Sequence, residues 1–143
     1  MELDKMTVEI EQQIDVKAPI AKVFEGIIRQ ITTGMVYPDG RSMNMHLERK
    51  PGGRWYRDLG DGNGHLWGFV QSIKAPTLLE LCGPTMMSYP VVNHIDFVLK
   101  EEGDSTHVRF RHRALGFIQD DHRTGMAEGW RGMIEAIKTE LES

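Results

Sequence analysis

Residues 120–142, "DDHRTGMAEGWRGMIEAIKTELE", carry the apolar pattern that decides the fold. The large apolar side chains recur at i, i+4, i+7, i+8, i+11 and i+15, and they are Met126, Trp130, Met133, Ile134, Ile137 and Leu141. This spacing predicts one long helix, from about Asp120 to Glu142, with a single buried stripe. Burying six such side chains is worth on the order of 10 kcal/mol gross, so we expect this helix to lie against a sheet.

The residues before this helix alternate in the manner of β-strands. Six such segments are predicted, at 43–48, 54–59, 66–73, 78–82, 91–99 and 105–115. A strand over 7–16 precedes them, followed by a helix over 18–31 that has Pro19 in its first turn. Residues 32–42 are predicted to be a loop or a short second helix. The whole chain, 1–143, is expected to form one α+β domain.

Residues 49–68, "RKPGGRWYRDLGDGNGHLWG", contain many glycines and raise the question of a phosphate or metal loop. The glycines do not follow the G-x-G-x-x-G spacing, no Gly-Lys-Ser/Thr is present, and the ligand spacing of a calcium loop fails. Asp61-Gly62 and Asn63-Gly64 are instead strong hairpin signals, because these residue types tolerate positive φ. We therefore interpret the segment as turns of a sheet.

Composition limits the partners and the location. The net charge of −4 argues against a general nucleic-acid partner, since such proteins carry a basic excess. No apolar run approaches the roughly 18 residues of a membrane span, so no stable membrane insertion is expected. The single cysteine and the lack of an apolar signal segment favour a reducing, cytoplasmic location.

Short motifs along nearly the whole chain resemble the SRPBCC, or START-like, superfamily, and within it the homologues of the activator of the 90-kDa heat-shock-protein ATPase. The motifs are "VKAPIAKVFEGI" at 16–27, "PGGRW" at 51–55, "GHLWGFVQSIKAPTLLEL" at 64–81, "EGDSTHVRFRHRALGF" at 102–117 and "GMAEGWRGMIEAIKTEL" at 125–141. The resemblance implies a helix-grip fold, in which a curved antiparallel sheet of about six or seven strands wraps around the C-terminal helix. It also implies a cavity between the two. Residues 31–41 depart from the family, which often has a tryptophan-bearing helix there.

The expected function is binding of a small hydrophobic or amphipathic molecule in that cavity, with no obligatory cofactor. Apolar residues that face inward by parity are candidates for the lining, and the predicted set is Met43, Met45, Trp55, Phe110, His112, Met126, Trp130 and Met133. The same residues fit a plain core nearly as well. A stress-response or co-chaperone-type interaction domain is a further alternative from the resemblance.

His112 is the candidate for chemistry, because it shares a parity with Val108 and Phe110. An imidazole in a cavity can act as acid or base near neutral pH, so an aromatase/cyclase-like enzyme is an alternative. A core histidine bonded to a neighbouring group is the competing interpretation, and we expect His112→Ala to leave folding largely intact. His94 and Asp96 are predicted to face solvent, and no metal site is expected.

Arg109, Arg111 and Arg113 share one parity, which predicts a basic stripe on the outer face of the sheet. Neighbouring acidic residues are expected to balance it. The alternative is a homodimer contact or an acidic protein partner, in which case reversing the three charges would abolish binding and spare stability.

Overall fold

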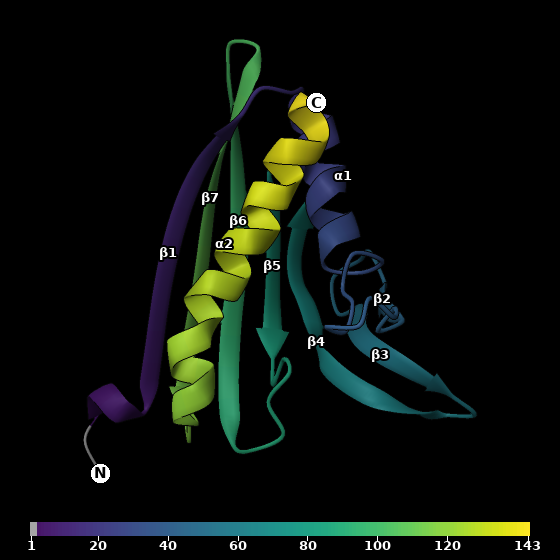
Figure 1. Cartoon of the computed structure of the whole chain (residues 1–143), viewed down its shortest axis with the longest axis vertical. Helices are drawn as coiled ribbons and strands as arrows, with labels where there is room; N and C mark the ends of the chain where they lie inside the picture. The colour runs from purple at the N-terminus through teal and green to yellow at the C-terminus, as the bar shows by residue number, and fades with distance from the viewer. Residues whose placement is uncertain (1–2) are drawn as a thin grey trace.

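A computed structural model describes residues 3–143, of which residue 3 is described in its backbone alone, and shows seven strands and two α-helices (Figure 1). A short 3-10 helix, η1 (Leu3–Lys5), comes first. The remaining elements are β1 (Thr7–Val16), α1 (Ile20–Gln30), β2 (Met45–Leu47), β3 (Arg54–Gly60), β4 (Asn63–Lys74), β5 (Leu78–Gly83), β6 (Val91–Glu102), β7 (Ser105–Gly116) and α2 (Asp120–Glu142). The predicted order of strand, helix, six strands and long helix is confirmed.

All seven strands form one antiparallel sheet in the order β1-β7-β6-β5-β4-β3-β2. The chain therefore meanders from β2 to β7, and β1 closes the far edge beside β7. Figure 1 shows α2 lying obliquely across one face of the sheet, with α1 beside the C-terminal half of α2. This is the α+β architecture of the helix-grip fold, as predicted.

The glycine-rich segment is a hairpin. Three successive residues where β3 turns into β4 have positive φ, namely Gly60 at 86°, Asp61 at 55° and Gly62 at 78°. At the preceding turn, a Cβ on Gly53 would lie 1.9 Å from the carbonyl oxygen of Glu48, so only glycine fits. These glycines serve the turns of the sheet, and the interpretation of residues 49–68 is confirmed.

The core is made where α2 meets the central strands. Phe97 on β6 is paired with Phe110 on β7, and their ring centroids lie 5.1 Å apart. The Phe110 ring in turn lies 4.7 Å from the indole of Trp130. Of the predicted stripe on α2, four side chains are buried and Met133 and Leu141 are partly buried. The helix is therefore in direct contact with the sheet over its middle turns.

The connection between α1 and β2 contains no second helix. After the turn at residues 31–34, Val36 and Ser42 form an isolated antiparallel bridge, and Met43 donates a backbone hydrogen bond to Met35. This irregular excursion brings Met35 and Met43 to the side of α2.

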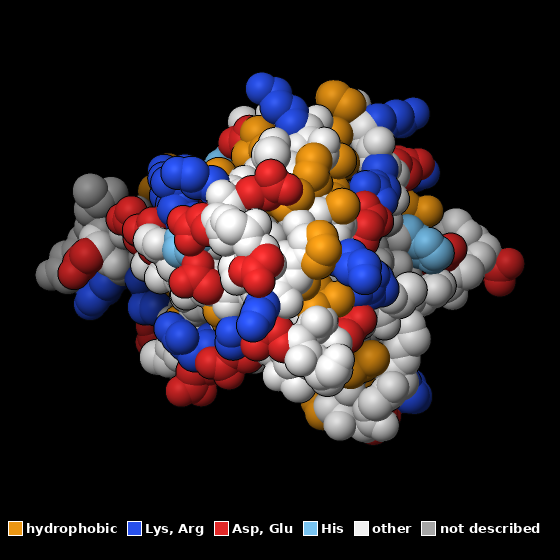
Figure 2. Space-filling model, turned by 90° about the horizontal axis from the view of Figure 1, so that it is seen from above, with side chains coloured by type: hydrophobic (Ala, Val, Ile, Leu, Met, Phe, Trp, Pro, Cys, Tyr) orange, Lys and Arg blue, Asp and Glu red, His pale blue; other side chains and the backbone are white. Residues whose placement is uncertain are grey.

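The surface is mixed in charge at the end where the chain terminates. Seen from that end, Lys and Arg side chains are interspersed with Asp and Glu around a narrow apolar band (Figure 2). Within the described part of the chain, none of the helices combines the length and the apolar character that crossing a membrane requires.

Candidate functional site

An open pocket of about 560 Å³ lies beside α2. One face of α2, from Asp121 to Ala136, forms its floor, and the α1–β2 connection and Met86 form its walls. The lining is dominated by the sulfur-containing side chains of Met35, Met43, Met86, Met126 and Met133, together with Trp130. A volume of this size and an apolar lining are typical of small-molecule sites.

Three glycines on α2 leave this pocket open. Gly125, Gly129 and Gly132 all line it, and a Cβ built on any of them would meet no atom of the described residues within 4 Å. Glycine in a helix interior costs about 1 kcal/mol relative to alanine. Since no close packing requires these glycines, their structural consequence is the space that they leave above the helix.

The polar end of the pocket lies at the first turn of α2. Asp121 and His122 line it there, and the far side carries Gln30. Behind His122, the hydroxyl oxygen of Tyr89 is 2.5 Å from the ring Nδ1, and the two rings stack with centroids 5.6 Å apart. His122 follows Asp120 and Asp121 in the first turn of α2, and its side chain is held by Tyr89.

The structure divides the predicted lining into two sets. Met43, Met126, Trp130 and Met133 line the pocket. The other four lie outside the lining and are buried in the core, and they are Met45, Trp55, Phe110 and His112. The indole N–H of Trp55, for example, donates to the carbonyl oxygen of Ile31 at 2.8 Å.

Several lining residues were not predicted. Met35 and Met86 come from irregular segments that show no periodicity. The glycines at 125, 129 and 132 did carry a signal, because the spacing i, i+4, i+7 puts them on one helical face.

His112 is wholly buried, and both of its ring nitrogens are engaged. Nδ1 accepts a hydrogen bond from the indole N–H of Trp130 at 2.8 Å, and Nε2 lies 2.7 Å from Oδ1 of Asn93. The amide nitrogen of Asn93 donates to the carbonyl oxygens of Gly83 and Pro84, so its oxygen is free to accept from Nε2–H. Burial lowers the pKa of His112 to about 4, which keeps the ring neutral.

This arrangement differs from the expected cavity between sheet and helix. Phe110, His112 and Trp130 fill the interface between β7 and α2, because their rings pack directly on one another. The open volume lies instead at the side of α2, under the α1–β2 connection. His112 therefore has the environment of a core histidine.

The outer face of the sheet is less solvated than expected. Asp96 is only 1% exposed, so the prediction that it meets solvent is wrong. Its carboxylate pairs with Arg111 at 3.2 Å and Arg113 at 3.7 Å, and His94 lies 3.6 Å away. The basic stripe is thus balanced by a neighbouring acid, which was the first interpretation of it.

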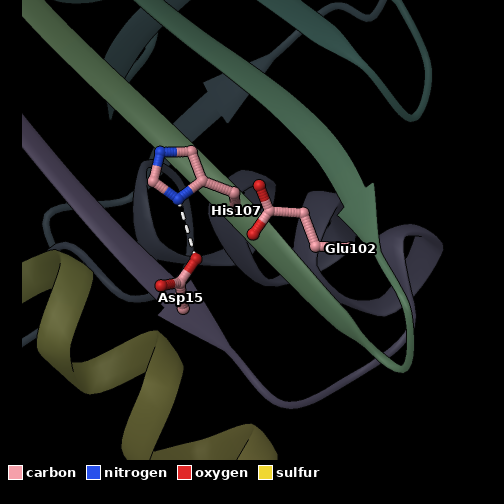
Figure 3. A group of neighbouring side chains, drawn as sticks. All are labelled: Asp15, Glu102 and His107. Atoms are coloured by element: carbon pink, nitrogen blue, oxygen red, sulfur yellow. Dashed lines mark hydrogen bonds and ion pairs between the residues drawn. The ribbon is translucent and has the colours of Figure 1, made fainter.

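One cluster has the residue types of a metal site. Asp15, Glu102 and His107 converge at the end of the sheet near the β6–β7 hairpin (Figure 3). The Nδ1 of His107 is 2.7 Å from Asp15, and its Nε2 is 2.9 Å from the side-chain oxygen of Gln13. A metal ion bound to a ring nitrogen of His107 would have to replace its contact with Asp15 or with Gln13. The carboxylates of Asp15 and Glu102 are both exposed. This cluster lies outside the pocket.

Comparison with known proteins gives a consistent picture of the fold. The sequence model of the family described as activator of Hsp90 ATPase homolog 1-like protein matches residues 17–142. No curated protein matches the chain in sequence.

Solved structures agree at low sequence identity, which shows the fold alone. Mll3558 from Rhizobium loti is 21% identical, with a TM-score of 0.71 over 95% of this chain and 98% of that one. The Aha1 dimer from Colwellia psychrerythraea is 19% identical, with a TM-score of 0.65 over 94% and 96%. BexL, a di-domain ARO/CYC from the BE-7585A biosynthetic pathway, is 15% identical, with a TM-score of 0.66 over 97% of this chain and 51% of that one.

Proposed function

Because the chain belongs to the family of activator of Hsp90 ATPase homolog 1-like proteins, we propose that it uses the helix-grip fold of that family as a receptacle for a small hydrophobic or amphipathic molecule. The proposed site is the pocket beside α2, and no cofactor is invoked.

The observation that carries the proposal is the open face of α2. Gly125, Gly129 and Gly132 lower the helix propensity of the element on which the core depends, and no close contact within residues 3–143 requires them. Alanine at each position would fit without a clash. These three glycines all lie on the floor of one pocket. A ligand that occupies the space above them would account for their presence.

The lining supports a ligand that is apolar over most of its surface. Methionine is unbranched and polarizable, so five methionines can adapt to the shape of a bound molecule. Trp130 adds a flat aromatic surface at the floor. A capacity of about 560 Å³ is within the range of about 300–1,000 Å³ for drug-sized ligands.

Binding of the neutral apolar dye Nile red tests the proposal. The wild-type protein is expected to take up the dye saturably, with a rise in dye fluorescence, and native mass spectrometry should show a one-to-one complex. Gly129→Leu fills the pocket with a side chain that has room to enter, so the affinity is expected to fall on the order of tenfold or more.

Glu128→Leu is the matched control, because Glu128 is exposed on the same helix and does not line the pocket. It adds the same side chain and should leave dye binding unchanged. The proposal is rejected when wild-type protein takes up no dye, or when Gly129→Leu binds as well as Glu128→Leu.

The alternative functions find less support in the geometry. Proton transfer by His112 in a cyclase-like reaction would require one of its two hydrogen bonds to break, and the ring lies outside the pocket. An acidic protein partner at the basic stripe would compete with Asp96, which already pairs with Arg111 and Arg113.

A further inference from the structure

The hydrogen bond between Tyr89 and His122 occupies Nδ1 of the imidazole and leaves Nε2 as the ring nitrogen that could bind a ligand. The backbone N–H of Gln119 donates to the hydroxyl oxygen of Tyr89 at 3.3 Å, which leaves the hydroxyl proton for His122 Nδ1 at 2.5 Å. An imidazole nitrogen is a better acceptor than a phenol oxygen, whose lone pair is delocalised into its ring. His122 is therefore held with its proton on Nε2.

The Nε2–H of His122 is available to a ligand. Among the residues that the structure describes, no group forms a hydrogen bond with this nitrogen, while the side chain itself lines the pocket. An N–H donor at one end of an apolar pocket is the kind of polar group that orients a ligand. It is suited to a carbonyl or hydroxyl oxygen.

The charge of the pocket limits what that ligand can be. The polar side chains in the lining are Gln30, Asp121 and His122, and within the described residues no Lys or Arg lines the pocket. The carboxylate of Asp121 lies in the same end as His122. An anionic head group would lose its hydration without gaining a cation, and it would be repelled by Asp121.

We propose that the pocket selects a neutral, largely apolar molecule that ends in a carbonyl or hydroxyl oxygen, which the Nε2–H of His122 binds. Tyr89 is the positioning residue, because it acts through His122 and does not itself line the pocket. This inference rests on the proposed function, and it adds the chemical class of the ligand and the residue that recognises it.

Three probes with the same ring body separate the classes, namely naphthalene, 2-acetylnaphthalene and 2-naphthoate. Their dissociation constants are measured with the full chain by displacement of Nile red. The ketone is expected to bind about fivefold more tightly than naphthalene, which is the ratio that one net hydrogen bond supplies. The carboxylate is expected to bind on the order of tenfold more weakly than the ketone.

Variants of His122 and Tyr89 test whether these residues cause the preference for the ketone over naphthalene. In His122→Phe the ratio between naphthalene and ketone affinities should fall to about one, because the N–H donor is gone. His122→Gln keeps an amide N–H near the position of Nε2, and it should restore part of the ratio. Tyr89→Phe should lower the ratio without removing it, since the ring of His122 loses its fixed proton position.

The outcomes distinguish this inference from the function on which it rests. If the wild-type protein takes up no Nile red, the proposed function fails. If it takes up the dye but no probe displaces it, this inference is overturned and the proposed function stands. If naphthalene binds but the ketone has no advantage, or keeps its advantage in His122→Phe, the assignment of His122 is overturned. If 2-naphthoate binds as tightly as the ketone, the neutral ligand class is overturned, although the pocket remains.

Discussion

The indole N–H of Trp130 donates a hydrogen bond to Nδ1 of His112 at 2.8 Å, and both side chains are buried between α2 and β7. The opposite nitrogen of the same ring donates to Asn93, whose amide reaches the carbonyl oxygens of Gly83 and Pro84. One neutral imidazole thereby connects the terminal helix, the sheet and the β5–β6 connection.

Stability is expected to fall on acidification because of His112. Its pKa is about 4 in the folded protein and near 6.5 when unfolded, so the unfolded chain binds the extra proton first as the pH falls. The loss starts near pH 6.5, is complete near pH 4 and amounts to on the order of 3 kcal/mol. Urea unfolding at pH 7 and pH 4.5 measures it.

His112→Gln is the control, since carboxylates also titrate in this range. The difference in unfolding free energy between the two pH values should be smaller in the variant than in the wild type. An equal pH dependence in both proteins would mean that His112 is not kept neutral by the fold.

Removing the imidazole itself is expected to destabilise the fold, in contrast to the expectation from the sequence. His112→Ala leaves a cavity and leaves the N–H of Trp130 and the oxygen of Asn93 without partners. We expect a loss on the order of 3 kcal/mol in unfolding free energy. Trp130→Phe removes the hydrogen bond to His112 and also the second ring of a buried indole, so it is expected to destabilise the protein as well. A His112→Ala protein as stable as wild type would contradict this view.

The fold was predictable from the sequence because its signals are local. The stripe from Met126 to Leu141 has helical period, and the strands alternate with period two, so element types and order follow from spacing. Parity alone placed His112 on the inward face. Its partner Asn93 could not be predicted, because that pairing depends on the register between β6 and β7.

The pocket was harder to predict because its walls are irregular. Met35 and Met43 reach α2 through a non-periodic connection, and Met86 lies in the segment between β5 and β6. Nothing in the local sequence fixes how such segments fold back. The glycine spacing on α2 was the one local sign of an open helix face.

Alanine at the pocket glycines is expected to stabilise the protein. In Gly129→Ala and Gly132→Ala the new methyl group meets no atom within 4 Å in the part of the chain that the structure describes, so the helix gains propensity without a clash. Each change should raise the unfolding free energy by about 0.5–1 kcal/mol. Thermal or urea unfolding measures it.

Gly26→Ala on α1 is the contrasting variant. A Cβ there would lie 3.3 Å from Cγ2 of Ile137, where α1 packs on α2, so little or no stabilisation is expected. If Gly26→Ala raised the unfolding free energy as much as Gly129→Ala and Gly132→Ala do, the open face of α2 would not explain their stabilisation.

Charge reversal at the outer face is expected to depend strongly on which arginine is changed. Arg111 lies between Glu11 on β1 and Asp96 on β6, and the Asp96 carboxylate is nearly inaccessible to solvent. Arg111→Glu would place three carboxylates side by side and leave Asp96 with a weaker partner, at a cost on the order of 3 kcal/mol. At this position we therefore expect charge reversal to lower stability, in contrast to the expectation from the sequence.

Arg109 provides the matched comparison on the same strand and face. The residues directly opposite it are Gln13 and Val98, so Arg109→Glu places no like charge directly opposite the new carboxylate and should change the unfolding free energy by less than about 1 kcal/mol. Urea unfolding of both variants at pH 7 decides the matter. An equal loss in unfolding free energy in Arg111→Glu and Arg109→Glu would show that pairing with Asp96 does not stabilise the sheet.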